Sequence, residues 1–218
     1  SLIATAATAT IGRVSNNARP ATNTSNDRNR NRFVPEPFVG STKNISLSDY
    51  AGKYVALVFY PKDFTFVCPS ELIALDHKVA ELEKRNAVIL GVSMDDAETH
   101  AKWRATSTDE GGIGELDYAL IADDSKALSE AFDVVHEESG LSYRATFLID
   151  TNGVVQNATH NNLPLGRNME ELVRRVDALQ FHEQTGEVCP ANWQPGKAGM
   201  TATAEGVKEY LTEYASSL

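Results

Sequence analysis

Cysteine is scarce in this sequence, with Cys68 and Cys189 as the only two among 218 residues. Two cysteines are too few for a disulfide framework and too few for a zinc site of the usual cysteine-rich kind. Cys68 also lacks a second cysteine three positions away, which is the spacing that disulfide oxidoreductases use. One structural disulfide and two inert thiols both remain open, so the cysteine count alone does not decide their role.

Other absences exclude further classes of protein. No apolar run approaches the length that crosses a membrane, and no internal repeat is present. The 20 lysines and arginines are outnumbered by 30 acidic residues, and the net charge of −10 argues against general nucleic-acid binding, which depends on basic groups that face phosphates. The histidines show no metal-ligand spacing, and we interpret all of them as structural or surface residues: His77, His100, His136, His160 and His182.

The most informative region that is present surrounds Cys68. An apolar run at 54–60 predicts a buried strand, and apolar residues at helical spacing predict a helix at 69–85. Cys68 stands where the strand has ended and the helix begins, and Pro69 suits the first helical position. A thiol there lies next to unpaired backbone N–H groups and the positive end of the helix dipole. Both favour the thiolate, which is the form that attacks electrophiles.

The rest of the chain alternates between predicted strands and helices, and its length and hydrophobic content of 42% suit one domain with a sizeable core. Asn152-Gly153 between two apolar runs is a strong hairpin signal. This order predicts an α/β fold with a mixed central sheet and helices on both faces. Further strands are predicted at 87–93, 116–121, 144–150 and 154–159. Further helices are predicted from a cap at Asp95 or Asp96 to about 104, and at 125–132, 169–180 and 204–215.

The two ends of the chain differ in composition from the middle. Residues 1–33 carry five arginines against one acid, Asp27, and they are rich in Ala, Thr, Ser and Asn. Low acid content with arginine and serine resembles an organellar transit peptide, but a disordered tail or a cloning remnant explains the same composition. Both interpretations stay open. From about residue 185, prolines and glycines interrupt regular structure before the last predicted helix.

Pro61, Thr65 and Cys68 form the pattern Pro-x-x-x-Thr-x-x-Cys, which resembles the signature of the peroxiredoxins, thiol peroxidases on a thioredoxin-like scaffold. The wider segment is similar to the typical 2-Cys class, which includes alkyl hydroperoxide reductase C and the thioredoxin peroxidases. Arg144 matches the position of the family's active-site arginine. The segments 162–167 and 186–193 are also family-like, and Cys189 in the second matches the resolving cysteine. The likeness runs from about residue 46 to the C-terminus.

This resemblance implies a division of the chain and a set of site residues. It implies a thioredoxin-like peroxidase domain at 34–184 and a C-terminal arm at 185–218, after the N-terminal segment 1–33. Cys68 would be the peroxidatic nucleophile that becomes a sulfenic acid, and Cys189 of another subunit would resolve it as a disulfide. No haem, flavin or metal is implied. The remaining site residues implied by the family are Thr65, Arg144 and Pro61 for catalysis, with Glu71 and Trp103 behind them.

The residue types suit these roles, although each also has a plainer explanation. Arg144 stays charged and offers several donors, so it could hold the thiolate and donate to peroxide oxygens, or it could form a surface salt bridge. Thr65 can accept one hydrogen bond while it donates another, or it can merely cap a turn. Pro61 could shield the sulfur or simply end the strand. Glu71 and Trp103 could equally be a helix-start acid and a core aromatic residue.

The resemblance also implies substrates and partners. It predicts an enzyme for hydrogen peroxide and alkyl hydroperoxides that is recycled by thioredoxin or a thioredoxin-like reductant. It implies a homodimer and a decamer of five dimers, with neither nucleic acid nor membrane as a partner. The expected compartment is the cytoplasm, or a mitochondrion or plastid if residues 1–33 are a transit peptide. A rival hypothesis is an oligomeric holdase chaperone or a peroxide-signalling relay on the same scaffold.

One further stretch resembles a family motif. Residues 111–114 read Gly-Gly-Ile-Gly, which is similar to the Gly-Gly-Leu-Gly motif of peroxide-sensitive members, although a simple flexible loop would have the same composition. Those members pair the motif with Tyr-Phe on the C-terminal helix, where this chain has Tyr210-Leu211. The incomplete pair predicts intermediate sensitivity to overoxidation of Cys68 to sulfinic acid.

Overall fold

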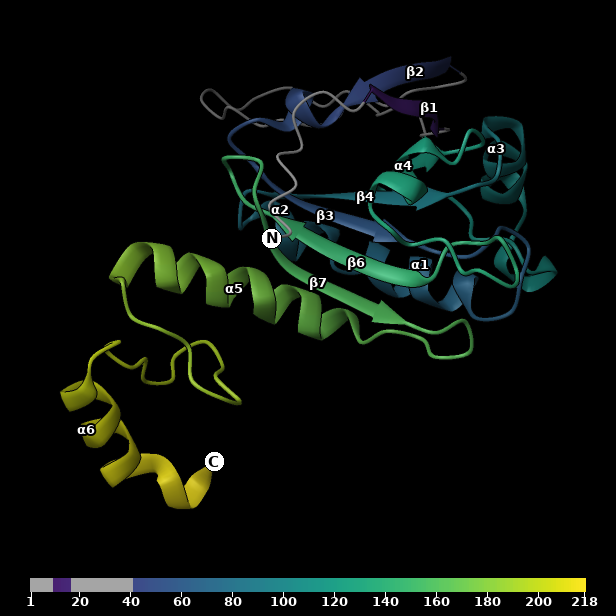
Figure 1. The fold of residues 1–218 in the computed structure, drawn as a ribbon. Coiled ribbons are helices and arrows are strands. Elements are labelled where there is room, and N and C mark those ends of the chain that lie inside the picture. Colours follow the sequence, from purple (N-terminus) through teal and green to yellow (C-terminus); the bar gives the residue numbers. More distant parts are fainter. Residues whose placement is uncertain (1–9, 17–40) are drawn as a thin grey trace, which may run out of the picture. The chain divides into compact units, whose positions relative to one another are not determined.

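The computed structural model describes residues 10–16 and 41–218 (Figure 1). The chain divides into two compact units, one that ends at Arg167 and one that begins at Asn168. Within the described residues, no helix combines the length and the hydropathy that a membrane span requires. The division at 184 and 185 that the family resemblance implies stays a prediction.

Among the described residues, the first unit is built on one seven-stranded sheet in the order β2-β1-β5-β4-β3-β6-β7. β4 pairs in parallel with both β3 and β5, while the other neighbours are antiparallel. The mixed sheet predicted from the sequence is therefore confirmed. The strands are β1 (Thr10–Asn16), β2 (Ser41–Ser46), β3 (Tyr54–Phe59), β4 (Ala87–Ser93), β5 (Ala119–Ala122), β6 (Arg144–Ile149) and β7 (Val155–Asn161).

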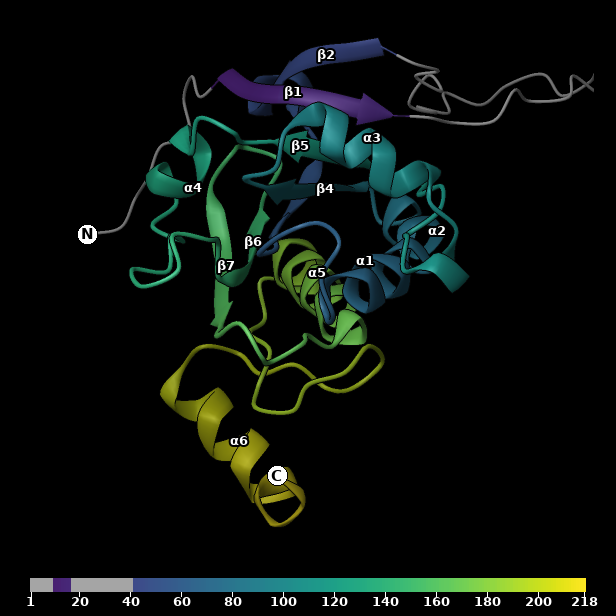
Figure 2. The same cartoon turned by 90° about the vertical axis from the view of Figure 1, so that its right-hand side faces the viewer.

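Helices cover both faces of this sheet, as predicted. Figure 2 shows α4 on one face and α1, α2 and α3 on the other. Their bounds are α1 (Cys68–Asp76), α2 (Val79–Glu83), α3 (Ala97–Ala105) and α4 (Ala127–Ala131). The second unit contains α5 (Met169–Thr185) and α6 (Ala204–Tyr214). Three short 3-10 turns are also described: η1 (Leu47–Tyr50), η2 (Thr108–Glu110) and η3 (Ala215–Ser217).

The central strands are buried on both faces, which explains their continuous apolar sequences. Every residue of β3 is buried. Phe59 packs its ring against Phe132 and Phe147, with centroid separations of 5.6 and 5.8 Å. The next residue, Tyr60, points to the opposite face, where its ring centroid lies 6.2 Å from that of Trp103 on α3. The end of β3 is therefore packed on both faces of the sheet, where the chain enters the loop that precedes Cys68.

The single helix predicted at 69–85 is wrong, because two helices occupy this stretch. α1 already begins at Cys68 and ends at Asp76, and α2 begins at Val79 and ends at Glu83. Between them the N–H of Lys78 bonds the carbonyl of Leu75 (2.9 Å), a three-residue spacing that tightens the chain and ends the α-helical ladder. The Asp76 carboxylate accepts from the N–H of Asp117 (2.6 Å), a partner that local sequence does not reveal.

The strand predicted at 116–121 also differs, since β5 spans only Ala119–Ala122. The reason is the buried side chain of Arg104 on α3. Its guanidinium donates to the carbonyls of Leu116 (2.6 Å) and Tyr118 (3.1 Å). These carbonyls bond a side chain instead of a neighbouring strand, so the ladder with β4 starts one residue after Tyr118.

Most other elements match the prediction with shifts at their ends. β4 has the predicted bounds, Asp96 caps α3 through the N–H of Thr99 (2.8 Å), and α5 continues beyond the predicted end to Thr185. The Asn-Gly hairpin joins β6 to β7, with the Gly153 N–H bonded to the carbonyl of Asp150 (3.0 Å). The sequence analysis predicted neither β1 nor β2. β1 falls inside segment 1–33, and the rest of that segment lies outside the described residues.

Candidate active site

Cys68 is fully buried at the first position of α1. The β3 ladder ends with the N–H of Tyr60, which bonds the carbonyl of Val92 (2.9 Å), and a short loop then leads to the helix. Val67 occupies the N-cap position and makes no side-chain cap. Because valine offers no acceptor, the N-cap side chain does not compete with the sulfur for the positive end of the helix.

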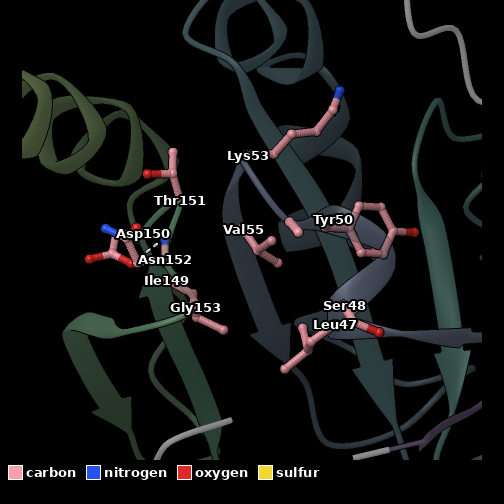
Figure 3. Close-up of a pocket in the computed structure, with 11 residues that line it drawn as sticks. Leu47, Ser48, Tyr50, Lys53, Val55, Ile149, Asp150, Thr151, Asn152 and Gly153 are labelled. Atoms are coloured by element: carbon pink, nitrogen blue, oxygen red, sulfur yellow. Dashed lines mark hydrogen bonds between the residues drawn. The ribbon is translucent and has the colours of Figure 1, made fainter. Parts of the chain in front are cut away.

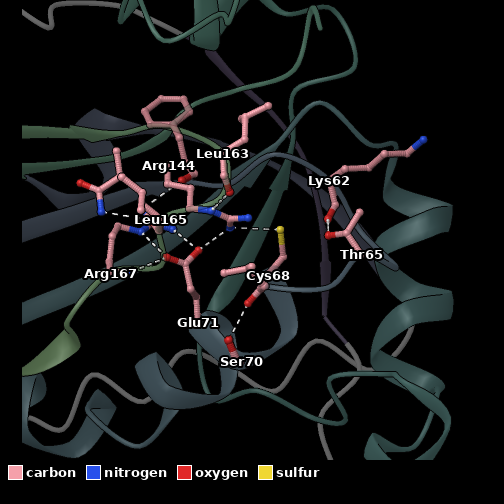
Figure 4. A network of polar contacts seen from close by, with 12 residues as sticks. Lys62, Thr65, Cys68, Ser70, Glu71, Arg144, Leu163, Leu165 and Arg167 are labelled. Carbon is pink, nitrogen blue, oxygen red and sulfur yellow. Dashed lines mark hydrogen bonds and ion pairs between the residues drawn. The ribbon is translucent and has the colours of Figure 1, made fainter.

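Arg144, the first residue of β6, reaches the sulfur of Cys68. Its Nη1 donates to Cys68 Sγ (3.3 Å) and to Glu71 Oε2 (2.8 Å), and its Nε donates to the carbonyl of Leu163 (2.7 Å) (Figure 4). The side chain is only 5% exposed, so its charge acts on the sulfur with little screening by water. The first residue of β6 thus contacts the thiol at the start of α1, although the two residues are 76 positions apart in sequence.

Glu71 lies one turn after Cys68 and holds two arginines. Its carboxylate accepts from Arg144 and from three N–H groups of Arg167: the backbone N–H (2.8 Å), Nε (2.9 Å) and Nη2 (2.9 Å). Arg167 Nη1 donates to the carbonyls of Phe59 and Ala145, both at 2.9 Å. The carboxylate therefore connects the first turn of α1 to the ends of β3 and β6.

Glu71 is ionised in this setting. Burial by itself raises the pKa of Glu71, but the hydrogen bonds from Arg167 and the charges of Arg167 and Arg144 outweigh it, so the pKa lies below its ordinary value. Two arginines and one carboxylate leave a net positive charge beside the Cys68 sulfur. That charge favours a bound anion or a thiolate at this place.

The loop between β3 and α1 carries Pro61 and Thr65. Pro61 is buried, and the Thr65 hydroxyl donates to the carbonyl of Lys62 (2.8 Å). Figure 4 shows the sulfur of Cys68 between the guanidinium of Arg144 and the loop with Thr65. Since the hydroxyl donates within the loop, its oxygen lone pairs remain to accept a hydrogen bond.

Trp103 supports this loop from α3. It is fully buried, and its indole N–H donates to the carbonyl of Gly111 (3.1 Å). Its ring centroid lies 5.8 Å from that of Phe64, a loop residue with a φ of 51°. A left-handed conformation is strained for a residue with a side chain, so it persists only where packing holds it. Trp103 thus packs against the loop that precedes Cys68.

A buried pair of titratable groups, Asp63 and His100, anchors the same loop. His100 Nδ1 lies 2.6 Å from Asp63 Oδ2, both side chains are fully buried, and the Tyr60 hydroxyl donates to Asp63 Oδ1 (2.8 Å). His100 Nε2 faces the carbonyl of Ile121 (3.2 Å), which only accepts, so Nε2 carries a proton. The contact with Asp63 needs a second proton. The pair is therefore neutral as a whole, whichever group keeps the shared proton.

Cys189 belongs to the second unit and is partly buried there. Its thiol donates to the carbonyl of Ala178 on α5 (3.4 Å). Burial raises the pKa of the Cys189 thiol, and the charge of Arg174 opposes part of that rise. Both cysteines are free thiols.

Comparison with known proteins identifies the family of this chain. The model of the AhpC/TSA family matches residues 35–158, which include Pro61, Thr65, Cys68 and Arg144. The chain belongs to the AhpC/TSA family. The model of the C-terminal domain of 1-Cys peroxiredoxin matches residues 178–213. The predicted resemblance to the peroxiredoxins is thus confirmed.

Individual relatives agree with this assignment. Peroxiredoxin-2 of Bos taurus is 45% identical over 80% of this chain and 88% of its own length. Thioredoxin peroxidase of Fasciola hepatica is 46% identical over 83% of this chain and 93% of its own length. The reduced 2-Cys peroxiredoxin of Plasmodium vivax superposes with a TM-score of 0.77 at 46% identity, covering 79% of this chain and 89% of that one. The predicted thioredoxin-like fold and peroxidase class are confirmed.

The structure of this peroxiredoxin brings the predicted residues of the first unit together and adds some that sequence reasoning missed. Cys68, Arg144 and Glu71 form one connected network, and Thr65 lies on the adjoining loop. Arg167 received no role from the sequence, although it ends the family-like segment 162–167. The overlooked signal is the acidic residue at the start of the helix, because a carboxylate that is buried there requires cationic partners.

A pocket of about 190 Å³ lies away from Cys68, at the opposite end of β3 and β6. Figure 3 shows η1 on one side of it and the β6–β7 turn on the other. Asp150 lines it, but its oxygens accept from the N–H groups of Asn152 and Val154 and from the amide of Gln156. This carboxylate therefore stabilises the turn. No group of three or more potential metal ligands occurs among the described residues.

Proposed function

We propose that this chain reduces hydrogen peroxide and small alkyl hydroperoxides at Cys68, and that Cys189 of a second subunit resolves the oxidised sulfur as a disulfide. The peroxidase class follows from the family and its relatives. The observation that carries the assignment to Cys68 is the 3.3 Å contact between Arg144 Nη1 and the buried sulfur at a helix start. The combination supplies the charge that a thiolate needs in a site shielded from water.

In the first step the Cys68 thiolate attacks one peroxide oxygen. The S–O bond forms as the O–O bond breaks, and the second oxygen leaves as water or an alcohol after taking up a proton. A low thiol pKa cannot by itself explain fast reaction, since nucleophilicity falls as the pKa of the thiol falls. The site must also stabilise the charge that moves onto the leaving oxygen. Arg144 is the proposed donor for that charge, because its fixed guanidinium already faces the sulfur.

The neighbouring residues would orient this donor and the substrate. Glu71 fixes Arg144 through Nη1, and the carbonyl of Leu163 fixes it through Nε. Thr65 would accept a hydrogen bond from the peroxide O–H, since its own proton is given to Lys62. Pro61 would keep water from the sulfur as part of the buried loop wall. We propose that Trp103 acts only by holding the loop.

In the second step the sulfenic acid of Cys68 reacts with the Cys189 thiol of a partner subunit. The S–S bond forms as the S–O bond breaks, and the oxygen leaves as water with the proton of Cys189. A dithiol reductant then restores both thiols by exchange. We propose thioredoxin or a thioredoxin-like protein, a choice supported by the relative named thioredoxin peroxidase. The proposed assembly is a homodimer, with a decamer of five dimers as the larger form.

The first test follows oxidation of the pre-reduced protein by one equivalent of hydrogen peroxide on a non-reducing gel, with mass measurement of each species. Wild type should form a covalent dimer. Cys189→Ser should stop at sulfenic or sulfinic acid on Cys68, and Cys68→Ser should stay unmodified. Absence of rapid oxidation at Cys68 in wild type would contradict the proposal and favour the holdase or structural alternative.

We propose the cytoplasm as the compartment. The alternative is a mitochondrion or plastid, because the composition of segment 1–33 resembles that of a transit peptide. A fluorescent protein fused behind residues 1–33 tests this directly. Diffuse cytoplasmic fluorescence is expected, and import with cleavage of the segment would contradict the proposal.

A further inference from the structure

In the second unit, the segment around Cys189 lies along one face of α5. The contacting residues of the helix are Arg174, Ala178, Phe181 and His182, which share a face at helical spacing. The Cys189 thiol donates to the carbonyl of Ala178 (3.4 Å), and His182 Nδ1 donates to the carbonyl of Glu187 (2.7 Å). The thiol is therefore held at a defined place on the helix.

Trp193, which follows Cys189 in the sequence, also packs against α5. It is 4% exposed, and its ring centroid lies 4.9 Å from that of Phe181. Its carbonyl accepts from Arg174 Nη1 (3.0 Å), and its indole N–H donates to the carbonyl of Lys197 (3.1 Å). Arg174 thus fixes the chain four residues after Cys189, while Ala178 holds the thiol itself.

Arg174 is itself fixed by Glu171. Nε donates to Glu171 Oε2 (2.6 Å) and Nη2 donates to Glu171 Oε1 (2.8 Å), which is the bidentate geometry that restricts a guanidinium most. These bonds lower the pKa of Glu171 to about 2, so the pair keeps its charges throughout neutral and mildly acid solution. Arg174 therefore offers Nη1 to Trp193 with little freedom.

The positive charge of Arg174 also affects the pKa of the Cys189 thiol. The other titratable groups of α5 and of the segment up to Cys189 are Glu170, Glu171, Arg175, Asp177, His182, Glu183 and Glu187. Burial raises the pKa of the thiol, and Arg174 is the charged neighbour that opposes this rise. A thiol must lose its proton before it attacks, so this neighbour favours the reactive form.

We propose that Arg174 is a positioning residue for the resolving step: it holds the Cys189 segment on α5 through Trp193 and stabilises the thiolate that attacks the Cys68 sulfenic acid. The inference rests on the proposed function, since it needs Cys189 to be the resolving thiol. In the step, the Cys189 thiolate forms the S–S bond as the S–O bond of Cys68 breaks. The released hydroxide takes up the proton that Cys189 gave and leaves as water.

The test separates the two chemical steps by rapid acid quench after addition of hydrogen peroxide. Loss of the Cys68 thiol and formation of the disulfide are measured by mass, from pH 6 to pH 9, for wild type, Arg174→Gln and Arg174→Lys. Arg175→Gln is the matched control, because Arg175 also donates to Glu171 Oε1 (2.9 Å) from the next position of α5.

Arg174→Gln should leave oxidation of Cys68 unchanged and move the rate–pH profile of disulfide formation to higher pH. The rate at pH 7 should fall severalfold, because the loss of thiolate is only partly offset by the greater nucleophilicity of a more basic thiolate. Sulfinic acid on Cys68 should increase accordingly, since the sulfenic acid waits longer. Arg174→Lys should keep the wild-type pH profile with a smaller loss of rate. Arg175→Gln should behave as wild type.

Two outcomes would overturn the inference while leaving the proposed function intact. One is equal disulfide formation in Arg174→Gln and Arg175→Gln at every pH. The other is a profile for Arg174→Lys that shifts as far as that of Arg174→Gln, which would remove charge as the cause. Failure of wild type to form any disulfide would instead contradict the proposed function. A fold check by circular dichroism accompanies each variant, and Arg174→Lys decides the matter if Arg174→Gln does not fold.

Discussion

At the scale of single residues, the sulfur of Cys68 depends on an arginine that other groups hold in place. Arg144 gives one nitrogen to the sulfur and to Glu71, and another to the carbonyl of Leu163. A lysine at this position could supply the charge. Its ammonium group could not donate hydrogen bonds in two fixed directions, as the rigid, planar guanidinium does. Substitution of Arg144 by lysine therefore separates the effect of the donor geometry from the effect of the positive charge.

Arg144→Lys should lower the rate constant of Cys68 with hydrogen peroxide about a hundredfold, because a fixed donor to the leaving oxygen is lost. Stopped-flow measurement of thiol loss checks this, with Arg85→Lys, in the turn after α2, as a control. Alkylation by iodoacetamide, which needs a thiolate but no oxyanion donor, should fall much less. An equal fall in both reactions would mean that Arg144 acts on the thiolate alone.

Glu71→Gln should destabilise the fold by about 3 kcal/mol, since two buried arginines lose their carboxylate partner. The folded pKa of Glu71 is lowered from the ordinary 4.5, so its contribution is fully present above pH 4.5 and is lost as the pH falls through the folded value. Urea unfolding should show a larger difference between Glu71→Gln and wild type at pH 7 than at pH 3. Glu81→Gln, at a half-exposed ion pair, is the control and should change little.

At the scale of elements, the loop between β3 and α1 is held by groups from α3 and β5. Asp63 on the loop bonds His100 on α3, and His100 bonds the carbonyl of Ile121 on β5. The N–H of Asp63 also donates to Asp95, which follows β4 (2.9 Å). The geometry of Pro61 and Thr65 is thus set by three elements that lie far from the loop in sequence.

His100→Leu should destabilise the fold by about 3–5 kcal/mol, because Asp63 stays buried without its partner. Asp63→Leu combined with His100→Leu should cost less than His100→Leu alone, since no buried carboxylate is then left without its partner. Chemical unfolding measures both, with His136→Gln as the control. Hydrogen exchange of loop 61–67 should rise in His100→Leu, and unchanged exchange would show that the pair does not hold the loop.

The glycine stretch 111–114 forms a fixed turn at the end of α3. The Gly112 N–H bonds the carbonyl of Ser107 (2.8 Å), Ile113 is 2% exposed, and a Cβ at Gly112 would collide with the carbonyl oxygen of Thr106. With Tyr210-Leu211 in place of the family's Tyr-Phe, we predict intermediate sensitivity to overoxidation. Titration of sulfinic acid against peroxide should fall between sensitive and resistant peroxiredoxins, and a curve equal to a fully resistant member would contradict this.

At the scale of the whole molecule, the proposed assembly should depend on exposed aromatic residues beside the active site. Phe66 is 98% exposed and Phe64 is 46% exposed, both on the loop before Cys68. Exposed apolar groups of this size next to one another are typical of interaction sites. Contact through this loop would couple assembly to the conformation of the site.

Phe66→Ser should therefore convert the proposed decamer into dimers. Sedimentation of the reduced wild type should give about 237 kDa, ten times the chain mass of 23.7 kDa. Val154→Ser, at a 43% exposed position of the β6–β7 turn, is the matched control and should sediment as wild type. A Phe66→Ser protein that keeps the wild-type mass would place the contact elsewhere.

Much of this protein is determined by local sequence. The buried strands β3 and β4, the Asn-Gly hairpin, the cap of α3 and the position of Cys68 at a helix start all depend on neighbours within a few residues. The motif spacing identified the family for the same reason, because the loop from Pro61 to Cys68 is a continuous segment.

Other features were decided only by tertiary structure, because their causes are distant in sequence. The helix after Cys68 breaks where Asp76 meets Asp117, and β5 starts late because Arg104 takes two carbonyls. The roles of Arg167 and of the Asp63–His100 pair require partners from 21 to 108 positions away. Buried polar groups must find partners wherever the fold brings them, and sequence patterns record periodicity rather than that pairing.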